Sequence, residues 1–180
     1  MPTFDTPRLE LRPLGASDEA LYCRLYCDPD VMRHIGAPLS HGAARTAFAT
    51  VIGLMWREAP TMQVWVMHDR AASADVGILA LIRHADVPDA REIGAMLLVE
   101  GQGRGFAVEA QTALLDWVFD AQGVRTVWSR NAPGNAAAAG VRLKLGFLRA
   151  RDGQEDTGEV HWRMSRERWN AARLARDGKT

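Results

Sequence analysis

The chain has few cysteines, and their arrangement excludes two kinds of site. Only two cysteines occur in 180 residues, Cys23 and Cys27. They lie four residues apart on a predicted helix, where they share a face without the geometry that a disulfide needs. No neighbouring His or Cys completes a set of metal ligands. We therefore expect small buried side chains here, no metal site and a reducing cytoplasm.

The chain also lacks an excess of either charge and any long apolar run. Basic and acidic residues number 22 each, so we expect no nucleic-acid partner that depends on a broad basic surface. No apolar stretch approaches the ~20 residues of a membrane span, and no basic region followed by an apolar core opens the chain. We expect neither a membrane association nor a signal peptide. The length fits one domain over residues 1–180, with monomer and homodimer both open.

Hydrophobic periodicity predicts a mixed α/β order of elements. Short connections between the three middle strands predict antiparallel pairing, whereas the later strand–helix–strand connection predicts a parallel crossover. The predicted strands cover residues 9–12, 63–68, 76–82, 92–99 and 125–130, with a final hairpin at 147–151 and 160–164. The predicted helices cover residues 18–27, 40–57, 106–121 and 135–145, with a short helical tail after Arg166.

The segment Gln102-Gly103-Arg104-Gly105-Phe106-Ala107 joins an apolar strand to an amphipathic helix. The first N–H groups of a helix have no internal partners and carry partial positive charge, and glycines let the backbone approach a ligand closely. The loop therefore indicates a phosphate-bearing cofactor, although a plain turn gives the same pattern. It is not a Walker loop, because Phe106-Ala107 replace Lys-Ser/Thr. It is not a dinucleotide fingerprint, because Val108 replaces the third glycine.

With this loop after the fourth predicted strand, the chain resembles the GNAT superfamily of N-acetyltransferases. Gln102, Gly105 and Ala107 fit the Gln/Arg-x-x-Gly-x-Gly/Ala motif of that family. Asn135, followed by Lys144-Leu145-Gly146-Phe147, resembles a second block of the family. The resemblance covers roughly residues 4 to 170.

The resemblance implies acetyl-CoA as donor and a primary amine as acceptor, either a protein N-terminus or a small molecule. The start of the chain, residues 6–14, is similar to the branch that includes ribosomal-protein alanine acetyltransferases. The implied fold is a mostly antiparallel, splayed sheet of about seven strands flanked by about four helices. The implied cofactor-binding residues are Met96, Leu97, Leu98, Gly101, Gln102, Gly103, Arg104, Gly105, Phe106, Ala107, Asn131 and Asn135, with Arg104 adding charge for a phosphate.

Two positions depart from the family pattern. Ala138 stands where a serine is expected, three residues after Asn135. Arg142 stands where many members place a tyrosine that protonates the leaving thiolate, and no tyrosine follows Tyr26. The acid is therefore unassigned. A non-catalytic acyl-CoA-binding module is the alternative function, and a nucleotide-binding protein unrelated to CoA is a third.

Amine transfer also needs a general base. Glu92, at the start of the strand that leads to the glycine loop, is the first candidate, and a carboxylate paired with Arg91 or Arg83 is the alternative reading. His84 and His34 come next, because imidazole titrates near neutral pH. A solvated histidine in a loop is the alternative for each.

Overall fold

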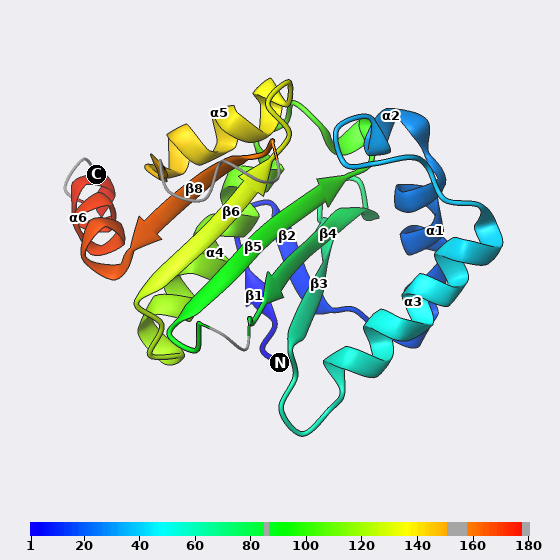
Figure 1. The fold of residues 1–180 in the computed structure, drawn as a ribbon, viewed down its shortest axis with the longest axis horizontal. Helices are drawn as coiled ribbons and strands as arrows, with labels where there is room; N and C mark the ends of the chain where they lie inside the picture. Colours follow the sequence, from blue (N-terminus) through cyan, green and yellow to red (C-terminus); the bar gives the residue numbers. More distant parts are fainter. Residues whose placement is uncertain (85–86, 151–157, 178–180) are drawn as a thin grey trace.

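The computed structural model describes residues 1–84, 87–150 and 158–177. Within them a single eight-stranded sheet has the order β1-β2-β3-β4-β5-β6-β8-β7 (Figure 1). The strands are β1 Phe4–Asp5, β2 Leu9–Pro13, β3 Met62–Asp69, β4 Ala74–Ile82, β5 Ala90–Leu97, β6 Thr126–Asn131, β7 Leu148–Arg149 and β8 Val160–Ser165. The helices are α1 Glu19–Cys27, α2 Pro29–Met32, α3 His41–Met55, α4 Phe106–Ala121, α5 Ala136–Leu145 and α6 Arg166–Asp177.

The predicted mixed, mostly antiparallel fold is confirmed. Strands β2 to β5 pair antiparallel in sequence order, and β5 pairs parallel with β6 across the α4 connection. The described residues form eight strands where about seven were expected, because β1 adds a two-residue pairing with β2. They form six helices: the four that were expected, the predicted tail as α6, and in addition the four-residue α2.

Each face of the sheet carries its own hydrophobic core, because successive strand residues point to opposite faces. On β3, Val64 and Val66 pack with residues of α1 and α3, while Trp65 and Met67 pack with residues of α4. In Figure 1, α1 and α3 stand beside β3 and β4, and α4 crosses behind the sheet. Helix α3 begins at a side-chain cap, where Ser40 Oγ accepts a hydrogen bond from the Ala43 amide at 3.2 Å.

The sheet opens between β5 and β6, as expected for a splayed sheet. The two strands pair only at Ala90–Thr126, Arg91–Val127 and Glu92–Trp128. Beyond Glu92, β5 continues to Leu97 and pairs with β4 on its other side alone. The backbone of the last five residues of β5 therefore borders an opening in the sheet, and the glycine loop lies at the end of that strand.

Close contact between β4 and β5 depends on a glycine. A Cβ added at Gly77 would lie 2.2 Å from the Met96 carbonyl oxygen, well inside van der Waals contact. No helix of the described segments combines the length and the apolar character needed to cross a bilayer.

Candidate active site

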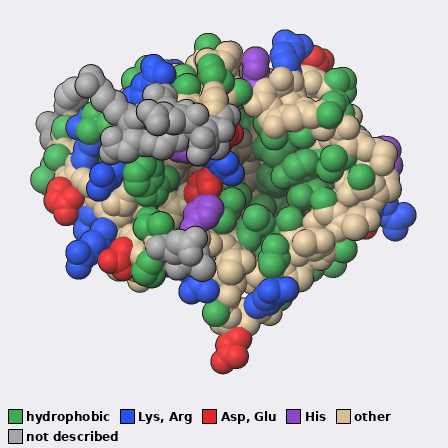
Figure 2. All heavy atoms as spheres, viewed as in Figure 1, with side chains coloured by type: hydrophobic (Ala, Val, Ile, Leu, Met, Phe, Trp, Pro, Cys, Tyr) green, Lys and Arg blue, Asp and Glu red, His purple; other side chains and the backbone are tan. Residues whose placement is uncertain are grey.

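A cavity of about 600 Å³ lies at the opening of the sheet. Its walls come from the end of β5, the glycine loop, the start of α4 and the inner side of α5, with residues 30–35 at one end. Residues that the sequence places far apart thus meet around one space. Figure 2 shows the sheet face hollowed beside the end of β5, with hydrophobic side chains lining the hollow.

The glycine loop has the backbone conformation of an anion site. Gly103 and Gly105 have φ angles of +72° and +83°, in the left-handed region that favours glycine. Gly105 is the N-cap of α4, and its carbonyl accepts from the amides of Val108 and Glu109. The amides of Phe106 and Ala107 lie in the first helical turn, where no intrahelical acceptor exists. The positive end of the α4 dipole therefore faces the cavity with unpaired donors.

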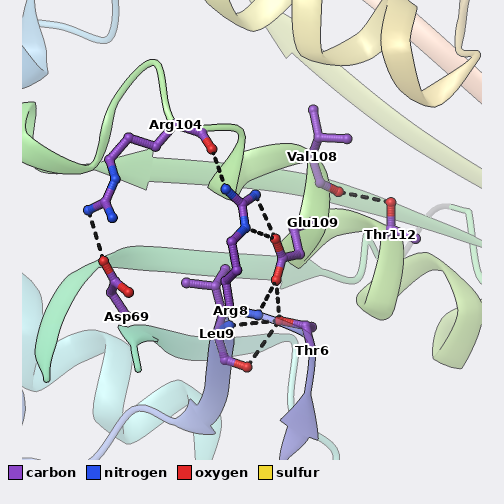
Figure 3. A network of polar contacts seen from close by, with 8 residues as sticks. All are labelled: Thr6, Arg8, Leu9, Asp69, Arg104, Val108, Glu109 and Thr112. Atoms are coloured by element: carbon purple, nitrogen blue, oxygen red, sulfur yellow. Dashed lines mark hydrogen bonds and ion pairs between the residues drawn. The ribbon is translucent and has the colours of Figure 1, made fainter. Parts of the chain in front are cut away.

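A network of hydrogen bonds holds this loop to the N-terminal segment (Figure 3). Glu109 Oε1 accepts from Thr6 Oγ1 at 2.6 Å and from the Arg8 amide at 2.8 Å, and Oε2 accepts from Arg8 Nε at 2.7 Å. Arg8 in turn donates from Nη1 to the Arg104 carbonyl at 2.8 Å. Burial opposes ionisation of Glu109, but these donors outweigh it and hold the pKa of its carboxyl below the ordinary value. The loop is thus positioned before any ligand arrives.

Arg104 does not point into the cavity. Its Nη1 lies 2.8 Å from Oδ2 of the buried Asp69 (Figure 3). Its guanidinium lies over the Phe106 ring, 4.4 Å from the centroid. Burial opposes ionisation of Asp69, but hydrogen bonds from the amides of Ala71 and Ala72 and the charge of Arg104 lower the pKa of its carboxyl. To meet a phosphate, Arg104 must leave this ion pair.

The two asparagines of the predicted cofactor set have different surroundings. Asn135 lines the cavity, and its Oδ1 caps α5 by accepting from the Ala138 amide at 3.0 Å. No hydrogen bond from its Nδ2 is found within the described residues, which leaves this donor to face a ligand. Asn131 is buried, accepts from Trp162 Nε1 at 2.7 Å and donates to the Ala132 carbonyl.

Most of the predicted cofactor residues line one cavity. Residues that are neighbours in the sequence need not face the same space, so this agreement is not given by the sequence alone. The lining includes Met96, Leu97, Gln102, Gly103, Gly105, Phe106, Ala107 and Asn135. The lining leaves out Leu98, Gly101, Arg104 and Asn131. Leu98 belongs to the core shared with α1 and α3, and a Cβ at Gly101 would crowd Val76 at 3.1 Å. These two residues support the loop from behind.

A second cavity, of about 330 Å³, opens where β5 and β6 begin to part. It contains both predicted catalytic residues, Glu92 and His84, which the fold brings together: Glu92 Oε2 lies 2.8 Å from His84 Nε2. Glu92 Oε1 accepts from Arg130 Nε at 2.8 Å, and this carboxylate raises the pKa of the Arg130 guanidinium. The alternative pairing of Glu92 with Arg91 or Arg83 is therefore wrong. Acidic, basic and histidine side chains gather at this place on the face drawn in Figure 2.

His34, the other histidine considered as a base, lines the first cavity, with no contact to Glu92. The residues of these sites that were not predicted include Arg130, Gln111 and Arg142 as a cavity residue. The alternation of β6 could have indicated Arg130, because it lies two residues after Trp128, on the same face as Glu92. Among the described residues, no group of three His, Cys, Asp or Glu side chains is placed to hold a metal ion.

Fold and cavity together define a splayed-sheet protein in which the N-terminus of a helix lines the cavity at the opening of the sheet. Residues 8–148 match the family model of the acetyltransferase (GNAT) domain, so the chain belongs to the GNAT acetyltransferase family. The resemblance seen in the sequence is thereby confirmed at the level of the family.

Known proteins resemble the chain over most of its length. FsC-acetyl coenzyme A-N(2)-transacetylase of Aspergillus fumigatus is 25% identical, and the match covers 93% of this chain and 78% of that protein. An acetyltransferase structure from Agrobacterium tumefaciens aligns with a TM-score of 0.77 at 24% identity, over 91% of this chain and 94% of the other. The ribosomal L7/L12 alpha-N-protein acetyltransferase RimL, solved in complex with coenzyme A, aligns with a TM-score of 0.76 at 16% identity, over 91% and 98%. These structural matches share the fold, and the ribosomal-protein branch is one among several.

Proposed function

We propose that this protein transfers an acetyl group from acetyl-CoA to a primary amine by direct attack. The observation that carries the proposal is the single cavity shared by the unpaired amides of α4 and the unpaired edge of β5, with His84 and Glu92 where the opening begins. Acetyl-CoA supplies a thioester whose carbonyl carbon accepts the amine. The names of the transacetylase and of RimL both specify a nitrogen acceptor, which supports an amine here.

The residues of the first cavity fit a nucleotide-linked thioester. The amides of Phe106 and Ala107 bind the diphosphate, and Gly103 and Gly105 leave room for it. The backbone of Met96 and Leu97 pairs with the amides of the extended arm, as another strand would. Asn135 donates to that arm from the opposite wall. Arg104 adds positive charge to the phosphate site once its guanidinium leaves the ion pair with Asp69 and binds the phosphate.

His84 accepts the proton of the amine, either directly or through a water molecule. Because Glu92 accepts a hydrogen bond from His84 Nε2, the proton of neutral His84 resides on Nε2 and Nδ1 is the basic nitrogen. Glu92, whose other oxygen is bound by Arg130, orients the imidazole. Replacing His84 with Gln should lower kcat by about a hundredfold. A kcat close to that of the native enzyme would exclude His84 as the base.

The cofactor site has a matched test at Ala107. Ala107→Glu places a carboxylate where the phosphate binds, and Ala107→Gln adds the same bulk without charge. An acidic residue in the first turn is favourable for a helix, so both variants should fold. Calorimetry should show coenzyme A affinity falling at least about tenfold further for Glu than for Gln, since a like charge costs more than bulk. Equal losses would show a steric effect and refute the phosphate assignment.

The acceptor test is a thiol-release assay with acetyl-CoA and a panel of amines. The panel includes peptides that begin with alanine, polyamines, amino acids and aminoglycosides. Turnover with any member supports the transferase. Tight coenzyme A binding without turnover on any acceptor would instead support the non-catalytic acyl-CoA-binding module.

A further inference from the structure

Arg142 is a buried cation without a carboxylate partner. Its exposed fraction is 4%, and it reaches between α5 and α4 to donate from Nη1 to Gln111 Oε1. The centroid of the Phe147 ring lies 5.7 Å from Arg142 Cζ, and Arg142 Nε has no hydrogen-bond partner in the described part of the chain. No ion pair to Arg142 occurs within the described residues. A buried charge left in this state costs several kcal/mol in general, so its retention calls for an anion that the polypeptide does not supply.

Both Arg142 and Gln111 line the first cavity, so the missing anion can come from its ligand. Burial lowers the pKa of the Arg142 guanidinium to about 10, and the side chain still carries its charge at neutral pH. Gln111 stands five residues beyond Phe106 on α4, about 7–8 Å along the helix from the amides that face the phosphate. Two exposed cations, Arg33 and Lys144, also line the cavity, and Arg33 is paired there with Asp30.

We propose that Arg142 is a catalytic residue that holds the negative charge on the sulfur as coenzyme A leaves. This inference rests on the proposed function, in which the acyl group is a neutral acetyl and the loop amides bind the diphosphate. Apart from the carbonyl oxygen, which is anionic only in the tetrahedral intermediate, the group that becomes anionic is the sulfur. As the amine nitrogen bonds to the acyl carbon, the C–S bond breaks and its electron pair stays on sulfur. His84 takes the proton from nitrogen, and Arg142 stabilises the thiolate until water protonates it.

Arg142 acts as a fixed charge and does not give up its proton. A thiol has an ordinary pKa of about 8.5, so the thiolate is the weaker base of the two. A preorganised cation in a site that excludes water is worth far more than in solution, because it needs no reorganisation when the charge develops. Both tyrosines of the chain lie in α1, so neither stands on α5 to protonate the leaving sulfur. The charge of Arg142 stabilises the thiolate electrostatically instead.

The first test needs no variant: the thiol pKa of bound coenzyme A, measured by thiolate absorbance as pH is varied. We expect it to lie about one unit or more below that of free coenzyme A, because an adjacent cation favours the charged form. Arg142→Met should return the value to that of the free thiol and lower kcat about a hundredfold, whereas Arg142→Lys should restore part of both. An unshifted thiol pKa in the native protein would overturn the proposal.

Gln111→Glu provides a test that leaves Arg142 in place. The new carboxylate pairs with the guanidinium, so kcat and the thiol shift should fall as in Arg142→Met while the thermal midpoint is kept or rises. An active Gln111→Glu enzyme with an unchanged thiol pKa would count against the proposal.

Two further arms separate other sources of the anion. If Arg142→Met weakens binding of adenosine 3′,5′-diphosphate as much as that of coenzyme A, the arginine serves a phosphate. If the native enzyme prefers succinyl-CoA to acetyl-CoA and Arg142→Met reverses this, it serves an acyl carboxylate. Either result refutes the role at sulfur. Failure of the native protein to bind coenzyme A at all would refute the proposed function itself, which is a different outcome.

Discussion

Replacing Glu109 with Gln tests how the glycine loop is held in place. The substitution keeps the shape of the side chain and removes the charge that Thr6 and Arg8 bind through three hydrogen bonds. Hydrogen bonds to a charged group contribute about 1.5–3 kcal/mol, and solvent screening reduces pairs at the surface. The Glu109 side chain is 14% exposed and that of Arg8 is 49% exposed. We therefore expect the free energy of unfolding to fall by about 1–2 kcal/mol at pH 7.

The assay is urea unfolding at several pH values. At a slope of about 2 kcal/mol per molar urea, the midpoint should fall by about 0.5–1 M. The pKa of Glu109 is lowered in the folded protein, so its contribution is present above the ordinary carboxyl pKa and is lost as pH falls through the folded value. The gap between native protein and variant should therefore be full at pH 7 and close in strong acid.

The matched control is Glu58→Gln, an exposed residue with no ion pair or hydrogen bond within the described part of the chain. At any pH it should change the free energy of unfolding by less than about 0.5 kcal/mol. A Glu109→Gln midpoint equal to that of the control at pH 7 would show that the network does not stabilise the fold. A gap that persists unchanged in strong acid would show that the loss is not due to the charge.

Other substitutions test the glycines and the Arg104 ion pair. Gly77→Ala should lower the free energy of unfolding by about 3 kcal/mol or more in chemical denaturation, because its Cβ would lie 2.2 Å from the Met96 carbonyl oxygen. A loss under about 1 kcal/mol would mean that β4 and β5 separate easily. Gly105→Ala should lower the free energy of unfolding by about 1–2 kcal/mol in the same assay, because φ at this position is +83°. It should also weaken coenzyme A binding in calorimetry, and an unchanged affinity would mean that the loop conformation is not required for binding. Asp69→Asn should raise coenzyme A affinity at low salt by releasing Arg104, and a lower affinity would remove Arg104 from the phosphate site.

The helices and strands with a repeating hydrophobic pattern could be predicted from the sequence. The apolar stripe of residues 106–121 predicted α4 with the bounds that the structure has, because it continues over four turns. Strand β1 could not be predicted in this way, since two residues contain no alternation. The glycine loop was predicted as a site because its physics is local: glycine torsions and helix amides depend on neighbours in sequence.

Glu92 and His84, the proposed catalytic pair, were predicted as separate candidates, and the contact between them was not predicted. It arises because Ile82 on β4 pairs with Glu92 on β5, which brings His84 back over the start of β5. The partner Arg130 depends on the register of a parallel pair across a whole helix, which no local pattern determines. The position of the Arg104 side chain was harder still to predict, because its partner Asp69 lies at the end of β3, far away in the sequence.

The opening of the sheet has a consequence for how the cleft can change. The end of β6 is held to β8 by the hydrogen bond between Trp162 and Asn131, while β5 is paired with β4 from Glu92 to its end at Leu97. The width of the opening between β5 and β6 and the conformation of the glycine loop are therefore set by different parts of the chain. Under the proposed function, substitutions on β8 should change which acyl group fits and leave the glycine loop in place.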